Sequence, residues 1–396
     1  MKNNWKTTTI GDLISVKRGY DLTSKDRIVG NIPVYGAAGQ NGFHNESKVN
    51  GPGIVIGRSG GSFGQVHYVE HESFWPHNTA MYVTDFNGND VDFVFYLLKN
   101  LDFSALNSGS AQPSLNRNYL YPVKVKAPHL DEQILIGQLL SSLDNKIELN
   151  NKINAELEAM AKLIYDYWFV QFDFPDANGK PYKSSGGKMV YNEELKREIP
   201  EGWTIKKLKD LSSRIGDGIH GTPQYVGESE FSFINGNNLK NGFIHINSET
   251  KKVNAEQYKK HFIKLDGNSI LISINGTLGN LAVFTDEKVM LGKSSAYINC
   301  HREHRAFCYQ YLKQKHVQNN FWNIATGSTI KNLSLESLKN LKLSYPQAEL
   351  IFEFNKLIRP IDEKRENIFK ENKKLFELRD WLLPMLMNSQ VTISKI

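Results

Sequence analysis

The 396-residue chain has little cysteine and no long apolar run, and these absences exclude several classes of protein. It contains two cysteines, Cys300 and Cys308, which are too few for a disulfide framework and fit a reducing compartment. No run approaches the ~18 apolar residues of a membrane helix, and the N-terminal MKNNWKTTTI lacks the apolar segment of a signal peptide. We therefore expect a cytoplasmic protein that does not insert into a membrane.

Catalytic motifs are also missing. The sequence has no Asp/Asn-Pro-Pro-Tyr/Phe, which holds a flipped adenine in amino-methyltransferases, and no His-Glu-x-x-His. In CHREHRAFC the two cysteines are too far apart for the paired ligands of structural zinc. FPDANGK, residues 174–180, faintly resembles a nuclease pattern but lies in a Gly- and Pro-containing linker. We expect no catalytic residue, no metal and no cofactor.

The composition is that of a globular protein with a mild excess of positive charge. Lysine and arginine outnumber aspartate and glutamate by 48 to 42, which gives a net charge of +6 and a pI near 8.9. This balance favours a polyanionic partner without identifying one. The length predicts two to three domains, each able to bury its own core.

The glycine-rich stretch GRSGGSFG, residues 57–64, raises the possibility of a phosphate-binding loop. Gln65 and Val66 follow it where a P-loop requires lysine and a hydroxyl residue, and QVHYV has the composition of a strand rather than of a helix. The apolar IVI precedes it. The pattern therefore predicts a strand–turn–strand in which glycine supplies positive φ.

An internal repeat is the strongest signal in the sequence. Ordered landmarks recur with offsets of 198 to 218 residues, which indicates a tandem duplication of α/β (α+β) units with a mainly antiparallel or mixed sheet. The matched landmarks are Trp5 with Trp203, Gly61-Ser62-Phe63-Gly64 with Gly276-Thr277-Leu278-Gly279, Tyr82 with Tyr297, Gly109-Ser110 with Gly327-Ser328, and Pro128 with Pro346.

A long heptad seam follows each repeat and predicts two long helices. The seam residues are Leu140, Leu143, Ile147, Asn150, Asn154 and Leu157 in the first helix, and Ile358, Ile361, Ile368, Asn372 and Leu375 in the second. Each helix could cap its own domain, but stripes of this length favour packing of the helices on each other. Asn154 and Asn372 hold equivalent positions, where polar residues fix register, and we expect leucine at both to stabilise the chain.

The predicted order is therefore domain, helix, linker, domain, helix. The boundaries are a first domain at residues 1–128, a helix at 129–170, a linker at 171–202, a second domain at 203–346 and a helix at 347–390.

Polar side chains at the predicted turns suit the reading of base edges and the binding of phosphates. The alternative is that these residues are polar only because loops are solvated. The candidates are Arg58, Ser59, Gln65, His77, Asn78, Gln112, Asn116, Arg117 and Asn118 in the first copy, and His220, Thr222, Gln224, Asn237, Asn238, Lys240, Asn275, Lys293, Lys331 and Asn332 in the second.

Over essentially its whole length the chain resembles the specificity subunit of a type I restriction-modification system. The resemblance lies in an ordered set of motifs, namely W…IGDL, PVYGAAGQNGF at 33–43, the Gly-Ser boxes at 109–116 and 327–334, PHLDEQ at 128–133, YDYWFVQFDFP at the end of the first helix, GDGIHGTPQY with NGNNL, and LRDWLLPMLM at 378–387. The second helix departs from the pattern because it begins PQAELIFEF without the Glu-Gln pair.

This resemblance implies a non-catalytic DNA-binding subunit. Two target-recognition domains would each read half of a split site in double-stranded DNA, on an antiparallel coiled coil with pseudo-twofold symmetry. The helices would dock two methyltransferase subunits and, through them, the restriction-translocase subunits. A stand-alone DNA-modifying enzyme and a protein-interaction scaffold are the competing hypotheses.

Overall fold

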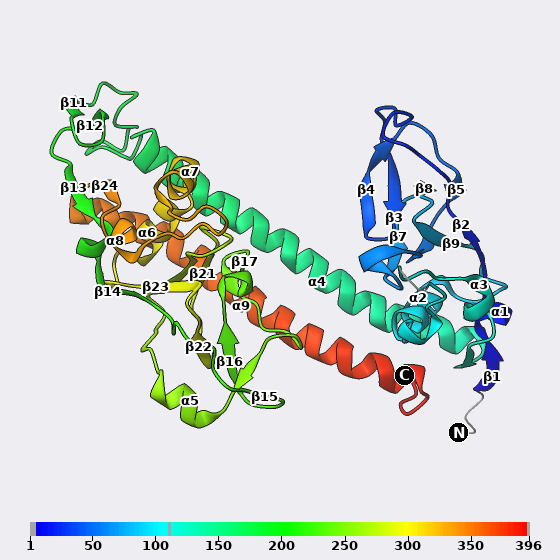
Figure 1. The fold of residues 1–396 in the computed structure, drawn as a ribbon. Coiled ribbons are helices and arrows are strands. Elements are labelled where there is room, and N and C mark those ends of the chain that lie inside the picture. The colour runs from blue at the N-terminus through cyan, green and yellow to red at the C-terminus, as the bar shows by residue number, and fades with distance from the viewer. Residues whose placement is uncertain (1–4, 110–111, 394–396) are drawn as a thin grey trace. The chain divides into compact units, whose positions relative to one another are not determined.

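A computed structural model describes residues 5–109 and 112–393 of the chain (Figure 1). The chain divides into two units. Unit 1 comprises Met1–Asn150 and Glu371–Ile396, and unit 2 comprises Asn151–Lys370. The two long helices, α4 (Leu130–Tyr165) and α9 (Ala348–Met387), each contribute one part to each unit. Within the described residues, no helix has the length and hydropathy needed to cross a lipid bilayer.

Unit 1 contains two four-stranded sheets and a separate strand pair. The first sheet is antiparallel, in the order β2 (Ser15–Arg18), β9 (Ala80–Asp85), β6 (Gly53–Gly57) and β7 (Val66–Val69). The second is mixed, in the order β4 (Gly39–His44), β3 (Ile32–Gly36), β8 (Ser73–Pro76) and β5 (Val49–Asn50), with β3 and β8 parallel. Strand β1 (Lys6–Thr9) pairs with β10 (Lys124–Ala127). The helices beside these sheets are α1 (Ile10–Leu13), α2 (Val91–Lys99) and α3 (Arg117–Leu120).

Unit 2 repeats the first sheet and the separate strand pair of unit 1, whereas its second sheet has a different strand order with the parallel pair at one edge. Its first sheet has the order β14 (Ser212–Asp217), β23 (Ser295–Cys300), β20 (Ser269–Ser273) and β21 (Leu281–Val283). Its second sheet has the order β15 (Tyr225–Val226), β19 (Lys252–Val253), β16 (Phe231–Ile234) and β22 (Val289–Leu291), with β16 and β22 parallel. Strand β13 (Thr204–Lys207) pairs with β24 (Lys342–Tyr345). The remaining elements are β17 (Leu239–Lys240), β18 (Phe243–Ile244), α5 (Ala255–Lys260), α6 (Arg305–Leu312), α7 (Lys315–Ile324) and α8 (Leu335–Lys339).

Strand register confirms the duplication predicted from the sequence. Tyr82 lies opposite Val55 in unit 1, and Tyr297 lies opposite Leu271 in unit 2. Trp5 and Trp203 immediately precede the equivalent strands β1 and β13. Of the Gly-Ser box at residues 109–116, Ser110 and Ala111 lie outside the described residues.

The glycine-rich stretch at residues 57–64 is a strand–turn–strand, as predicted. It joins the antiparallel strands β6 and β7, and the amide of Gly64 donates to the carbonyl of Gly57 at 2.8 Å. In unit 2 the amide of Gly279 donates to the carbonyl of Ser273 at 2.9 Å. Gly64 and Gly279 have φ of 76° and 82°, which only glycine adopts without strain.

Helices α4 and α9 run antiparallel within each unit. In unit 1, Asp144 binds Arg379 at 2.7 Å, and Asn150 Nδ2 donates to Asn372 Oδ1 at 2.8 Å. The partner number falls as the α4 number rises, which defines opposite chain directions. In unit 2, Glu158 pairs with Arg365, and the ring of Tyr165 lies against that of Phe354.

The seam residues pack both across the helix pair and onto the globular domains. Each helix therefore caps its own domain and also packs on the other helix, which combines the two alternatives considered from the sequence. Leu140 joins the core of unit 1, and Ile358 and Ile361 join the core of unit 2. Ile147, Asn150, Ile368 and Asn372 are also buried, whereas Leu143, Asn154, Leu157 and Leu375 are half-buried.

The equivalence of the two seam asparagines needs a correction. Asn372 is hydrogen-bonded to Asn150, whereas Asn154 Oδ1 is buried with no hydrogen-bond partner in the part of the chain that the structure describes. The residue that the repeat places opposite Asn154 is Ile368, the counterpart of Asn150, and an isoleucine offers no polar group.

The predicted linker at 171–202 is more ordered than a simple connector. Strands β11 (Met189–Asn192) and β12 (Arg197–Pro200) form a hairpin. Before it, α4 ends in a π-helical turn, Asp166–Val170. The rings of Phe172 and Phe174 lie 5.2 and 5.4 Å from that of Trp203, so this segment belongs to the core of unit 2.

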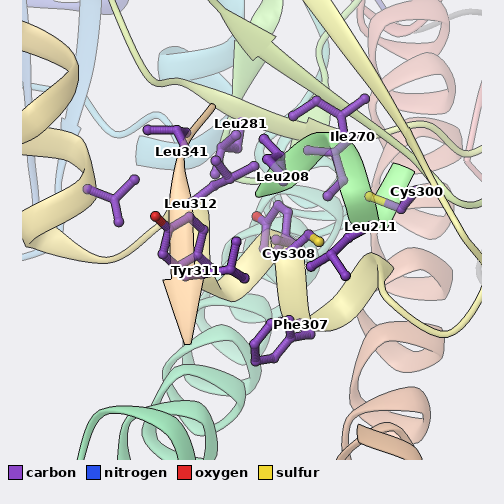
Figure 2. Close-up of a cluster of buried hydrophobic side chains, with 14 of the residues drawn as sticks. Leu208, Leu211, Ile270, Leu281, Cys300, Phe307, Cys308, Tyr311, Leu312 and Leu341 are labelled. Carbon is purple, nitrogen blue, oxygen red and sulfur yellow. The ribbon is translucent and has the colours of Figure 1, made fainter. Parts of the chain in front are cut away.

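The core of unit 2 contains both cysteines. Figure 2 shows Cys300 and Cys308 among Leu208, Leu211 and Phe307. A hydrogen bond with Cys300 and burial raise the pKa of the Cys308 thiol well above its ordinary value, so it behaves as an apolar core residue. Among the described residues, no group of three His, Cys, Asp or Glu side chains could hold a metal ion.

Candidate nucleic-acid interface

Three loops meet at one place in unit 1. We call them loop cluster 1, made of the described residues 58–65, 77–79, 107–109 and 112–118. The amide of Arg58 donates to the carbonyl of Thr79 at 2.9 Å, and the amide of Leu115 donates to the carbonyl of Arg58 at 2.7 Å. A β-bridge joins Ser59 to Ser114. Backbone hydrogen bonds therefore bring together candidates that are far apart in sequence.

Unit 2 has the same arrangement, which we call loop cluster 2, made of residues 274–280, 292–294 and 326–334. The amide of Ile274 donates to the carbonyl of Ser294 at 3.0 Å, and that of Leu333 to the carbonyl of Ile274 at 2.8 Å. A β-bridge joins Asn275 to Asn332. Lys293 and Lys331 lie in the same cluster; Lys293 is exposed and Lys331 is half-buried.

Two further candidate segments adjoin loop cluster 2. Ile219, next to His220, bridges to Gly292, which precedes Lys293. The amide of Gly236 donates to Ser294 Oγ at 2.9 Å, and this hydroxyl donates to Asn235 Oδ1 at 2.9 Å. Residues 219–224 and 235–240 are therefore held at the same edge of unit 2 as the cluster.

Three of the predicted contact residues form side-chain hydrogen bonds within the protein. His77 uses Nδ1 with Thr79 Oγ1 at 3.0 Å and Nε2 with a main-chain carbonyl at 3.3 Å. Asn116 caps α3 by accepting from the amide of Asn118 at 3.0 Å. Asn238 accepts from one main-chain amide and donates to one main-chain carbonyl, both at 3.0 Å. These hydrogen bonds help to hold the loops in shape, and DNA contact by these three side chains stays a prediction.

Other candidates leave more of the side chain open to a ligand. Arg58 donates from Nε to the carbonyl of Asn78 at 3.3 Å, and Asn78 in turn donates to Asp21. His220 Nε2 lies 2.8 Å from Asp217 Oδ2 while its side chain is 73% exposed. Arg58, Ser59, Asn78 and Asn275 are half-buried, whereas the exposed candidates are Gln65, Gln112, Arg117, Asn118, Thr222, Gln224, Asn237, Lys240 and Asn332.

Tyrosines lie behind both loop clusters as neutral hydrogen-bonding groups. The hydroxyls of Tyr20 and Tyr82 are 3.1 Å apart. Burial, with this contact, raises the pKa of Tyr82, and burial also raises the pKa of Tyr297. Both phenols are therefore neutral at neutral pH.

The loop at residues 57–64 matches Gly-x-Ser-x-Gly twice, through Ser59 and through Ser62. That motif makes a nucleophile only on a sharp turn from a strand into a helix, where the serine is exposed to a catalytic histidine. Here the loop joins two antiparallel strands. The matches therefore reflect a glycine-rich turn and not an active site.

None of the candidates predicted from the sequence lies on α5, although this helix lies beside the candidate loop at residues 219–224. Gln257 and His261 line a cavity of about 440 Å³ together with residues 219–224. The signal was available in KKVNAEQYKKHFIK, residues 251–264, which contains five lysines and one acidic residue.

A cavity of about 470 Å³ in unit 1 has the opposite charge. Its lining includes Glu70, Asp92, Asp144 and Glu148. Burial, with the nearby Asp92 carboxylate, also raises the pKa of Tyr68, which lines the same cavity. This concentration of carboxylates repels a polyanion, so the loop clusters and not this cavity suit DNA.

Comparison with known proteins follows the same division of the chain. The family model described as the type I restriction modification DNA specificity domain matches residues 2–159 and again residues 200–361. The MjaIX specificity subunit of Methanocaldococcus jannaschii is 26% identical over 327 residues, covering 77% of this chain and 70% of that protein. The HindI specificity subunit of Haemophilus influenzae is 25% identical over 378 residues, covering 79% and 81%.

A solved structure shares the fold. The S subunit of a type I restriction-modification system from M. genitalium aligns over 98% of this chain and 96% of that chain, with a TM-score of 0.62 and 19% identity. Since the family model matches most of the chain, and does so twice, the chain belongs to the family of type I restriction-modification DNA specificity proteins, and it is a sequence-specific DNA-recognition subunit rather than an enzyme.

Proposed function

We propose that each unit reads one half of a bipartite site in double-stranded DNA through its loop cluster. The observation that supports this proposal is that the two loop clusters share the same backbone hydrogen-bond pattern but carry different side chains. Arg58, Ser59 and Asn78 in unit 1 correspond to Ile274, Asn275 and Lys293 in unit 2. Loops with the same backbone structure can bind the duplex in the same orientation, while their different side chains select different bases.

The proposed base-reading and phosphate-binding groups are the open candidates. In unit 1 they are Arg58, Ser59, Gln65, Asn78, Gln112, Arg117 and Asn118. In unit 2 they are His220, Thr222, Gln224, Asn237, Lys240, Asn275, Lys293, Lys331 and Asn332. His77, Asn116 and Asn238 instead hold the loops in shape, so their substitution disturbs the contacts indirectly.

The long helices set the distance between the half-sites in this proposal. Helix α4 has 36 residues and α9 has 40. At 1.5 Å per residue, α4 alone runs about 54 Å, which exceeds one turn of duplex at about 34 Å. A rigid helix pair of this length favours two half-sites separated by a fixed gap.

The helices also carry the surface for partner subunits. Their exposed apolar residues are Leu130, Leu149, Met160 and Leu163 on α4, and Phe352, Leu357, Phe376, Leu378 and Trp381 on α9. Exposed apolar groups of this kind mark interaction surfaces. We assign this surface to two methyltransferase subunits, which connect the restriction-translocase subunits, in a complex that acts on cytoplasmic DNA.

A domain exchange tests the proposal. Residues 1–128 are replaced by the same domain of another family member, and the methylated motif is read across the genome of a strain that carries the partner subunits. We expect one half of the motif to change while the other half and the gap persist. Both halves changing together would contradict modular reading, and methyl transfer by the isolated chain would contradict a non-catalytic subunit.

Lengthening α4 within residues 132–169, with a matching insertion in α9, extends the test. Whole helical turns added to both helices should change the gap and leave both half-motifs unaltered. A change in either half-motif would show that the helices influence base reading as well as spacing.

A further inference from the structure

Unit 2 contains a basic segment that unit 1 does not. The chain between the equivalent strands β3 and β6 of unit 1 runs from residue 37 to 52, whereas that between β16 and β20 of unit 2 runs from 235 to 268. The extra length includes the segment at 251–264, which has five lysines and one acidic residue, while residues 37–52 have one lysine and one glutamate.

The fold anchors this segment and leaves its charges outside. Asn254 caps α5 by accepting from the amide of Gln257 at 2.9 Å. The ring of Tyr258 stacks on that of Phe231 in β16, with centroids 4.2 Å apart. Lys252 is half-buried and donates to Ser232 Oγ at 2.9 Å. The four exposed lysines of the segment are Lys251, Lys259, Lys260 and Lys264.

The four exposed lysines of the segment differ from those lysines of unit 2 that form ion pairs. Lys288 pairs with Glu230, Lys313 with Glu158 and Lys342 with Glu194. In the part of the chain that the structure describes, none of the four exposed lysines of the segment forms an ion pair. Their charge is therefore not compensated by a carboxylate of the protein, and because the four lie close together in the sequence, a polyanion gains by binding there.

The segment lies beside a proposed DNA-reading loop. Gln257 and His261 share the lining of the 440 Å³ cavity with residues 219–224. A duplex whose bases meet His220, Thr222 or Gln224 thus brings its backbone toward α5. Phosphate contacts of this kind fix a protein on the duplex without reading sequence.

We propose that Lys251, Lys259, Lys260 and Lys264 form a phosphate clamp on the duplex backbone beside the half-site read by unit 2. This assignment rests on the proposed function and adds to it an asymmetry between the units. Unit 2 supplies a larger share of the salt-dependent affinity, and unit 1 relies more on its loop cluster.

The test uses the full chain assembled with its methyltransferase subunits. All four lysines are changed to glutamine, and the matched control changes Lys180, Lys183, Lys209 and Lys315, four other exposed lysines of unit 2. In the sequence, Lys180 and Lys183 precede β11, Lys209 follows β13 and Lys315 begins α7. Figure 1 shows these three elements away from α5. Kd is measured between 50 and 300 mM salt on a duplex with the methylated motif and on one without it.

We expect the clamp variant to bind both duplexes more weakly by a similar factor. The slope of log K against log salt should become shallower by about 0.9 for each phosphate that the variant no longer neutralises, up to about 3.6 for four phosphates. The methylated motif should stay the same, and the control variant should match the wild type.

Other outcomes overturn the clamp. An unchanged salt slope shows that the lysines do not bind phosphate, and weaker binding confined to the motif duplex shows that they act in base reading. Failure of the variant to co-purify with the methyltransferase subunits assigns the segment to a protein partner. The proposed function fails separately, if the wild-type complex does not prefer the motif duplex. A milder variant, Lys259→Gln with Lys260→Gln, keeps the test valid if the fourfold variant misfolds.

Discussion

The seam asparagines give opposite predictions at two positions that the repeat makes equivalent. Asn150 Nδ2 donates to Asn372 Oδ1 at 2.8 Å and to Glu371 Oε2 at 2.9 Å. Asn154 Oδ1 is buried and has no hydrogen-bond partner among the described residues. Leucine should therefore stabilise the chain at position 154 and destabilise it at position 372.

The magnitudes follow from the cost of unpaired polar groups. Asn154→Leu removes a buried carbonyl whose desolvation is not compensated, and this should raise the free energy of unfolding by about 1–2 kcal/mol. Asn372→Leu removes the acceptor of a buried Asn150 amide hydrogen and should lower it by about 1–3 kcal/mol. In the double variant the two changes in the free energy of unfolding should nearly cancel, whereas the repeat alone predicts a clear increase in stability.

Urea unfolding of the full chain, followed by two spectroscopic probes, measures these changes. With an m-value of about 3 kcal/mol/M, a change of 1.5 kcal/mol moves the midpoint by about 0.5 M. Asn367→Leu, at an exposed position of α9, is the control and should stay within about 0.5 kcal/mol of the wild type. A lower midpoint for Asn154→Leu, or a higher one for Asn372→Leu, would refute the hydrogen-bond account.

Three further predictions concern single contacts. Burial raises the pKa of Asp362 to about 6 from an unfolded value of 3.8, so the folded state binds more protons than the unfolded state between these pH values. The stability of the chain should therefore fall by about 2 kcal/mol as the pH rises from 4 to 7. Asp362→Asn should remove this pH dependence in thermal melts. Gly279→Ala should lower the melting temperature more than Gly276→Ala does. Both glycines have positive φ, but only at position 279 would an added Cβ meet another side chain, Gln318 Oε1 at 2.1 Å. Equal losses would show that backbone conformation alone sets the effect. Glu158→Gln removes the carboxylate that pairs with the half-buried Lys313 and the buried Arg365, and it leaves Arg365 with Asp362 at 3.7 Å. The change should cost about 3–5 kcal/mol in chemical unfolding, and a neutral result would show that these groups reach solvent.

The sequence by itself determined the duplication, the two long helices and the nature of the glycine-rich turn. These features are local or periodic. A heptad stripe, a run of β-branched residues and a glycine that needs positive φ each act within a few residues of the chain. Two copies of such a pattern then predict two copies of a fold. The strand order of the first sheet repeats between the units for this reason, whereas the second sheets differ in their order.

Only the tertiary structure decided which polar side chains are available to a ligand. His77, Asn116 and Asn238 carry groups suited to base reading, yet each side chain forms a hydrogen bond within the protein that the sequence does not reveal. The fates of Asn154 and Asn372 differ because the residue across the helix pair differs. The position of α5 beside residues 219–224 likewise comes from sheet packing. Such contacts join residues distant in sequence, and a hydrogen-bond partner is set by register and packing, which no short stretch of sequence encodes.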